Sequence, residues 1–286
     1  MRKLTPSTDQ RTRGFTLVEL PLAMSILLII LGLVLTAFTG ALGQQRSTET
    51  AVNLDASLRR TSQIITQDLR NSAYGLITSQ PYASASTSIS VARLTDTAVH
   101  SVTSSATLFT TSTSVEVITP PGFSWPAGTR FLLINPTPAQ KTATSHVLTT
   151  AVTTSGTVNL THATTLNTIC YSPDNLVQRI NLVGYSLNPT QKILYRSSQG
   201  VETPLAYGVS NFTVTYIDTS GTSYTRMQDM PPSATLARVG LRLDMERPEK
   251  GGVRTRGLSS SIEIPKMFTL TNAPLKYIVP NSSVTC

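Results

Sequence analysis

One carboxylate stands alone in a long apolar run near the start of the chain. Glu19 follows the string Gly14-Phe15-Thr16-Leu17-Val18, and no charged residue occurs between Glu19 and Arg46. A carboxylate inside a membrane-length segment costs roughly 2.5–3.5 kcal/mol on insertion scales, so its presence needs a reason. Glu19 is therefore the first candidate for a functional group, and the segment that carries it is long enough to span a bilayer.

The rest of the chain offers no catalytic constellation. The histidines His100, His146 and His162 stand in Ser/Thr-rich surroundings without a close carboxylate or cysteine, which favours surface or strand positions over metal binding. No serine lies in a nucleophile elbow and no glycine-rich loop carries a phosphate-cradling lysine. The run Asp218-Thr219-Ser220-Gly221 is typical of a turn, not of a calcium loop. We therefore expect no catalytic residue, no metal and no cofactor, and a membrane-anchored enzyme is the least favoured class.

The string from Gly14 to Leu20 resembles the N-terminal signature of type IV pilins and type II secretion pseudopilins. The likeness covers residues 1 to about 45, where a basic start, a glycine, an aromatic residue, Thr-Leu, an acid at the fifth position after the glycine and an uncharged tail occur together. A secretory signal is one alternative, but its apolar core usually has about 7–15 residues. An ordinary membrane anchor is the other, and it explains neither the glycine nor the glutamate.

The resemblance implies a processing and assembly pathway. Prepilin peptidase would cut after Gly14 on the cytoplasmic side, and the new N-terminal residue, Phe15, would be methylated. Glu19 would pair with the N-terminal amine of a neighbouring subunit, because the two charges in hydrocarbon are much less costly together than alone. The implied partners are the peptidase and other major and minor pilins. The implied location is the inner membrane, crossed once with the head in the periplasm, and then the pilus or cell surface.

The pattern after the signature predicts one long helix with two halves. We expect a basic leader at 1–14, a transmembrane or filament-core half at 15–44, an amphipathic half at 45–75 and an exported β-rich head at 76–286. Tyr74-Gly75 is typical of a helix end. The second half carries a stripe at three- and four-residue spacing, which indicates one buried face. The stripe consists of Ala51, Leu54, Leu58, Thr61, Ile65 and Leu69.

Proline and glycine modify the first half of this helix. Pro21 falls just beyond the four free N–H groups of a helix that begins at Phe15, so we expect it to kink or loosen the first turns. Gly32, Gly40 and Gly43 lower helix propensity. They favour close packing between membrane helices, with a flexible filament-core segment as the alternative.

Charge and cysteine content agree with export. The formal net charge is +8, of which residues 1–14 contribute three, and basic residues remain on the cytoplasmic side of a membrane. The remaining charge is too mild to demonstrate nucleic-acid binding. Cys170 and Cys286 are the only cysteines. In an oxidising compartment we expect a bridge between them, worth on the order of 4–5 kcal/mol in the chain-entropy model. Two unpaired thiols are the alternative, because sequence does not supply the required distance.

Short alternating runs predict an antiparallel sheet in the head. Residues 81–114 are rich in Ser, Thr and Ala, which fits either a loop or thin strands. Gly156 between two Thr/Val-rich runs suggests a hairpin, and Trp125 is either an exposed contact or a core residue. The expected strands are 114–119, 130–135, 146–153, 157–160, 182–187, 192–196, 212–217, 237–244 and 259–264. The expected fold class is α+β, with the long helix packed on an antiparallel β-sheet head.

Short motifs in the head look like those of the larger minor pilins of the PilW type and the J-type pseudopilin. The motifs lie at 68–75, 193–196, 204–209, 212–216 and 238–243. The likeness implies a low-abundance minor pilin that primes or caps a type IV pilus, with DNA uptake, adhesion or twitching as the activity it serves. A minor pseudopilin of type II secretion is the alternative, because it shares the helix and the assembly chemistry.

A third hypothesis is a tip receptor that binds DNA or surfaces. Its phosphate-binding stretch would be the densest basic run, around the exposed hairpin tip expected at Gly251-Gly252. A solvated loop is favoured, because no aromatic residue that could stack on bases lies nearby. The run comprises Arg242, Arg247, Lys250, Arg254 and Arg256.

Overall fold

The computed structural model describes residues 18–78, 80–103, 114–135, 142–161, 175–231, 234, 236–249, 252–264 and 276–277. The chain divides into two units, Met1–Val52 and Asn53–Cys286, which we describe separately and call the stalk and the head. The elements are α1 (Glu19–Arg70), β1 (Ser72–Thr78), β2 (Ser88–Ser101), β3 (Ser114–Thr119), β4 (Arg130–Asn135), β5 (Thr142–Val147), β6 (Gly156–Thr161), β7 (Leu176–Asn188), β8 (Ile193–Ser198), β9 (Val201–Tyr207), β10 (Val209–Asp218), β11 (Ser223–Tyr224), the 3₁₀ turn η1 (Met227–Asp229), β12 (Leu236–Glu249), β13 (Gly252–Glu263) and β14 (Lys276–Tyr277).

Helix α1 has 52 residues, and its last turns belong to the head. The head portion carries the predicted stripe, whose members there are all buried: Leu54, Leu58, Thr61, Ile65 and Leu69. The helix ends at Arg70, so the predicted end at Tyr74-Gly75 is too late. The chain is already extended there, because neighbouring residues of β1 turn to opposite faces: Leu76 enters one core and Ile77 another.

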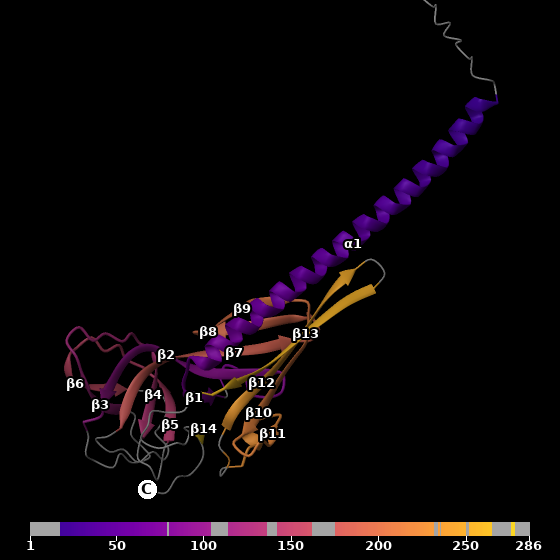
Figure 1. The fold of residues 1–286 in the computed structure, drawn as a ribbon. Helices are drawn as coiled ribbons and strands as arrows, with labels where there is room; N and C mark the ends of the chain where they lie inside the picture. The colour runs from indigo at the N-terminus through magenta and orange to yellow at the C-terminus, as the bar shows by residue number, and fades with distance from the viewer. Residues whose placement is uncertain are drawn as a thin grey trace, which may run out of the picture. The chain divides into compact units, whose positions relative to one another are not determined.

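The head strands form two sheets and a two-stranded ribbon (Figure 1). In the larger sheet β1, β2 and β7 are neighbours, and two strands, β4 and β8, pair with the other edge of β7. Its first half pairs with β4, which continues to β5 and β14, and its second half pairs with β8, which continues to β9. The smaller sheet has the order β11-β10-β12-β13, and β3 pairs with β6. Every described pairing is antiparallel except that of β14 with β5. The predicted α+β class, a helix packed on antiparallel sheets, is confirmed.

The helix packs into a core that both sheets line. Leu58 and Leu69 of α1 join Tyr185 of β7, Phe212 of β10 and Leu243 of β12 in one buried cluster. A second cluster is built between β3, β6, β4 and the start of β7, around Trp125. Trp125 is thus a core residue, which settles the two readings of this position. We call the part of the head around the second cluster the lobe; it comprises β3, β6 and residues 123–125.

Two strand expectations between residues 142 and 161 are wrong. The strand expected at 146–153 is β5, which lies at Thr142–Val147, and Leu148 packs into the second core. The hairpin expected around Gly156 does not form, because β6 pairs with β3 through positions such as Val117 and Val158. Of the segment left open at 81–114, residues 88–101 are strand β2, and its partner β7 was only half anticipated.

Candidate functional site: the apolar helix and its anchor

The stalk part of α1 exposes a long apolar surface. The large apolar side chains between Val18 and Phe38 are each 51–75% exposed, and no charged residue occurs at positions 20–45. The helix is the one candidate membrane span in the described part of the chain, with a mean hydropathy of 2.6 in its most apolar window. A surface of this length and hydropathy requires lipid or other apolar helices as neighbours.

The hydroxyl groups in this segment are satisfied within the helix. Ser25 Oγ donates to the Pro21 carbonyl at 2.8 Å, and Thr36 Oγ1 donates to the Gly32 carbonyl at 2.7 Å. Thr39 Oγ1 donates to the Thr36 carbonyl at 3.0 Å. Such bonds to carbonyls three or four residues earlier leave no hydroxyl in need of water. The segment therefore meets the hydrogen-bonding condition for burial in hydrocarbon.

The predicted processing residues Gly14 and Phe15 lie outside the described residues. Glu19 is the first residue of α1, and Val18 lies in a turn, which corrects the expected start at Phe15. Pro21 therefore falls in the first turn, where backbone N–H groups have no intrahelical partner. A proline there removes no helical hydrogen bond, so the expected loosening by Pro21 loses its basis.

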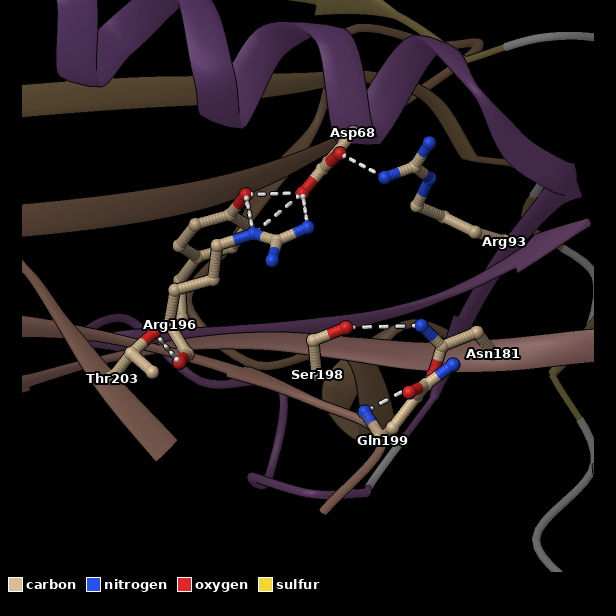
Figure 2. Close-up of polar contacts among 8 residues, drawn as sticks. Asp68, Arg93, Asn181, Arg196, Ser198, Gln199 and Thr203 are labelled. Atoms are coloured by element: carbon tan, nitrogen blue, oxygen red, sulfur yellow. Dashed lines mark hydrogen bonds and ion pairs between the residues drawn. The ribbon is translucent and has the colours of Figure 1, made fainter. Parts of the chain in front are cut away.

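At the other end of α1, one carboxylate anchors the helix in the head (Figure 2). Asp68 is buried, with its side chain only 5% exposed. Arg93 Nη1 of β2 lies 2.7 Å from Asp68 Oδ1, and Arg196 Nη2 of β8 lies 2.8 Å from Asp68 Oδ2. Arg196 Nε also donates to Oδ2 at 3.0 Å, and the hydroxyl of Tyr185 on β7 donates to the same oxygen. Both carboxylate oxygens are therefore engaged, and three strands hold one helical residue.

The anchor's electrostatics follow from burial around a fixed negative charge. Burial, and then the charge of Asp68, raise the pKa of the Tyr185 phenol above its ordinary value. Tyr185 consequently remains a donor over the whole physiological range. The two arginines keep 33% and 25% of their side chains exposed, so solvent shares the charge that exceeds the single carboxylate.

The turn after β8 is fixed beside the anchor. Asn181 Nδ2 donates to Ser198 Oγ at 3.0 Å, and Asn181 Oδ1 accepts from the Gln199 N–H at 3.1 Å (Figure 2). Gln199 and Gly200 have φ values of 54° and 79°, as a tight turn between two strands requires. Because Asn181 lies opposite Arg93 across β2 and β7, the same strand pair supports both the turn and the anchor.

Asp68 belongs to the motif at 68–75, and no role was predicted for it. A signal for that role existed, because Asp68 follows Ile65 by three positions and Thr61 by seven and so falls on the buried stripe. A buried acid requires a cationic or hydrogen-bonding partner. The partners could not be found in the same way, because Arg93 and Arg196 lie far away in the chain.

The remaining residues singled out in the sequence are dispersed. Cys170, Cys286, His162 and the side chain of His146 lie outside the described part of the chain. Of the two expected positions, surface or strand, His100 takes the second: it lies in β2 and is buried, with its ring 5.0 Å from that of Phe123. Asp218 lies at a turn, as predicted, where it accepts hydrogen bonds from the backbone N–H groups of Ser220 and Thr222. The hydrogen bond from the Ser220 side chain is the main reason why the pKa of Asp218 is lowered.

The basic stretch at 242–256 is largely paired with acids. Arg242 lies 3.2 Å from Asp244, Arg254 lies 3.7 Å from Glu249, and Arg256 lies 3.9 Å from Asp55 of α1. Strands β12 and β13 pair as far as Glu249 and Gly252, so Gly252 belongs to β13, and Gly251, the other residue of the expected tip, lies outside the described residues.

Comparison with known proteins identifies the stalk. The prokaryotic N-terminal methylation motif matches residues 9–35, a range that contains Gly14, Phe15 and Glu19. The N-terminal segment of the chain therefore carries a prepilin-type methylation motif, and in this segment the chain is similar to type IV pilins. The motif implies processing by prepilin peptidase, anchoring in the inner membrane before assembly, and assembly with pilins. Pilins are structural proteins without enzymatic activity. No curated protein and no solved structure was found to match this pilin-like chain.

Proposed function

We propose that this pilin-like protein is a minor pilin of the PilW type, a low-abundance subunit that primes or caps a type IV pilus. The observation that carries the proposal is the pairing of an exposed apolar helix, whose hydroxyls are satisfied internally, with a large head that contains separate cores. The helix supplies the surface by which subunits associate, and the head supplies the part that remains outside the apolar environment.

The size of the head supports a position at the end of a filament. The head unit spans Asn53–Cys286 and adds a lobe with its own core to the sheets that hold the helix. Subunits along a shaft repeat by one operation, so any bulk on one subunit must clear its neighbours at every step. A subunit at the tip meets that constraint on one side only.

In this proposal the N-terminal signature does the chemistry of assembly. Prepilin peptidase cuts after Gly14, the amine of Phe15 is methylated, and Glu19 pairs with the N-terminal amine of an adjacent subunit. The first residue of α1 carries this acid, where the positive end of the helix dipole also favours a negative charge.

The DNA-receptor alternative is weakened by the ion pairs of the basic stretch. Arg242, Arg254 and Arg256 each face an acid of the same chain, so these guanidinium groups are partly neutralised before any phosphate arrives. Of these pairs, Arg254 with Glu249 joins β13 to β12, whereas Arg242 pairs within β12 and Arg256 pairs with α1.

The test compares three variants of the full chain in a cell that makes pili. Gly14→Ala should retain the leader, which mass spectrometry of the membrane protein detects. Glu19→Ala should be processed normally yet be lost from sheared surface filaments. Ser25→Ala, a neutral change in the same segment, should behave as wild type. Quantification against the major subunit should give far less than one copy per shaft subunit.

Two results would contradict the proposal. Normal incorporation of Glu19→Ala into filaments would remove the pairing role of this carboxylate. Unchanged pili together with a loss of protein export, on deletion of the chain, would assign it to the type II secretion alternative.

A further inference from the structure

The outer edge of β13 is long and open. β13 pairs with β12 through twelve consecutive positions, from Gly252 opposite Glu249 to Glu263 opposite Arg238, without a register shift. Among the described residues no strand pairs with the other side of β13, which ends the smaller sheet. Such an edge presents a row of free backbone N–H and C=O groups to any strand that approaches it.

The hydrogen-bond pattern identifies which backbone groups are free. The Ile264 N–H donates to the Ala237 carbonyl at 3.1 Å, and these two residues continue the β12–β13 register. In an antiparallel pair the hydrogen-bonded positions alternate, so even-numbered residues of β13 turn their backbone groups to β12. The odd-numbered residues turn theirs outward: Val253, Thr255, Gly257, Ser259, Ser261 and Glu263.

Edge strand β9 of the larger sheet is protected against further pairing, whereas β13 is not. Edge strand β9 contains Pro204, and its pairing with β8 shifts register between Leu194 and Tyr195. Proline and bulges are devices that stop further strands from adding. β13 has neither. The outward residues are mostly small and uncharged, and the first of them, Val253, has 62% of its side chain exposed.

The two arginines of β13 do not guard the edge. Arg254 and Arg256 are even-numbered and share a face with the core residues Leu258 and Ile262. They form ion pairs with Glu249 and Asp55. The second of these pairs joins β13 to Asp55, which lies among the first residues of α1 that belong to the head.

We propose that the outer edge of β13 docks a neighbouring pilin-like subunit by accepting an edge strand from its head. This inference rests on the proposed function, because it assigns a second contact to the assembly that the helix begins. A strand edge alone buries less than the approximately 800 Å² per partner of a typical stable interface, so it acts together with the helix.

The partner is a different subunit and not a second copy. A two-fold pairing of β13 with the β13 of a copy is antiparallel. It would reverse every direction in the plane of the sheet, including that of residues 53–70, the part of the helix that packs on it. Subunits that enter one membrane by the same end share one direction, so the accepted strand comes from another edge on another head.

Single-residue hydrogen exchange tests the docking directly. In the isolated full chain in detergent, even-numbered amides of β13 should exchange slowly and odd-numbered ones fast. In filaments sheared from cells that contain the chain, the amides of Thr255, Gly257, Ser259 and Ser261 should slow by about tenfold or more. Protection that alternates with residue number is a signature of strand addition which burial by a side-chain contact does not produce.

Paired variants give an independent readout. Ser259→Pro and Ser261→Pro each remove one outward N–H, which an edge strand tolerates, and should reduce recovery of the chain in filaments at least about fivefold. Ser259→Ala and Ser261→Ala keep the N–H and should leave recovery unchanged. If a proline variant fails to fold, the exchange experiment on the wild type decides alone.

Failure of the docking is distinguishable from failure of the proposed function. A chain that enters filaments while its odd-numbered β13 amides still exchange fast overturns the docking and leaves the minor-pilin proposal intact. Concentration-dependent protection in the isolated chain would mean pairing with a second copy, which also overturns it. A chain that never enters filaments removes the proposed function and the docking together.

Discussion

At the scale of single residues, the ion pairs of Asp68 compensate for the unfavourable position of this acid near the C-terminal end of a helix. Asp68 lies two residues before the end of α1, where the negative end of the helix dipole disfavours an acid by about 0.3–1 kcal/mol. Arg93 and Arg196 outweigh that cost, because charge-assisted hydrogen bonds to a buried carboxylate are the stronger class. The carboxylate of Asp68 is therefore stabilised by its partners on the strands and not by the helix that carries it.

Removing the carboxylate should destabilise the head. Asp68→Ala leaves two guanidinium groups and the Tyr185 hydroxyl without their shared acceptor, and we expect a loss of about 3 kcal/mol in the free energy of unfolding. Asp68→Asn keeps the shape and should lose less. Urea unfolding of the full chain in detergent, followed by circular dichroism, measures both.

Asp55 supplies the matched control for this experiment. Its pair with Arg256 is exposed on both sides, so Asp55→Ala should change the free energy of unfolding by less than about 0.5 kcal/mol. Equal effects at positions 55 and 68 would mean that the Asp68 cluster is no anchor.

The raised pKa of Tyr185 leads us to predict that the head loses stability at alkaline pH. Its pKa is raised in the folded chain, so between about pH 10, where the unfolded chain loses this proton, and the higher folded pKa the native state holds one more proton. Stability therefore falls as pH rises, by about 1.4 kcal/mol per pH unit for this group. Tyr185→Phe should flatten the slope by that amount.

The remaining slope in Tyr185→Phe has a known source. Burial also raises the pKa of Tyr216, Tyr82 and Tyr224, which act in the same direction and keep their hydroxyl groups in this variant. Urea titrations at pH 9, 10 and 11 separate the contribution of Tyr185 from that of the other tyrosines. A slope identical to that of the wild type would show that Tyr185 ionises as freely in the folded head as in the unfolded chain.

At the scale of elements, local sequence patterns predicted the features that depend on neighbouring residues alone. The alternation in 114–119 and 130–135 predicted β3 and β4 with their bounds, and the helical stripe predicted the buried face of α1. Pairing is decided elsewhere in the chain. Nothing near Gly156 shows that β6 prefers β3, because that preference comes from the second core, to which Val115, Val158 and Trp125 contribute.

The candidate site divides in the same way. The signature around Glu19 is local and was legible, whereas the anchor requires three strands to meet one helix. The helix end was misplaced because Tyr74-Gly75 has the composition of a cap but lies in a strand that feeds two cores. Tertiary packing there overrides the local signal.

Because the lobe has its own core, we predict that it can unfold locally while the rest of the head stays folded. Trp125 is 3% exposed and contacts the rings of Phe123 and Phe131, so Trp125→Ala should cost the lobe about 3–5 kcal/mol. Amides of β3 and β6 should then exchange faster, while those of β10 and β12 should not change.

A matched substitution in the first core supplies the converse. Phe212→Ala removes a fully buried ring of β10 and should accelerate exchange in β10 and β12. If Trp125→Ala accelerated exchange equally throughout the head, the two cores would form one cooperative unit and the prediction would be wrong.

At the scale of the whole molecule, the predicted disulfide bridge depends on the expected export of the head. Cys170 and Cys286 lie outside the described residues, so their pairing is still a prediction from the sequence. An exported head meets an oxidising compartment, where a bridge closing a loop of more than a hundred residues contributes on the order of 4–5 kcal/mol.

The bridge has a direct chemical test. Non-reducing digestion of the membrane-extracted protein should yield one peptide that joins Cys170 to Cys286, and Cys170→Ser should lower the urea midpoint. Quantitative alkylation of both thiols without prior reduction would exclude the bridge.

The Asp68 anchor also has a mechanical consequence. A pull along α1 reaches the larger sheet through the chain itself, which continues into β1, and through the Asp68 carboxylate, which is bound from β2 on one oxygen and from β8 on the other. Tension on the helix is therefore shared among three strands of one sheet, so no single strand bears the whole load when the stalk is drawn out of a bilayer.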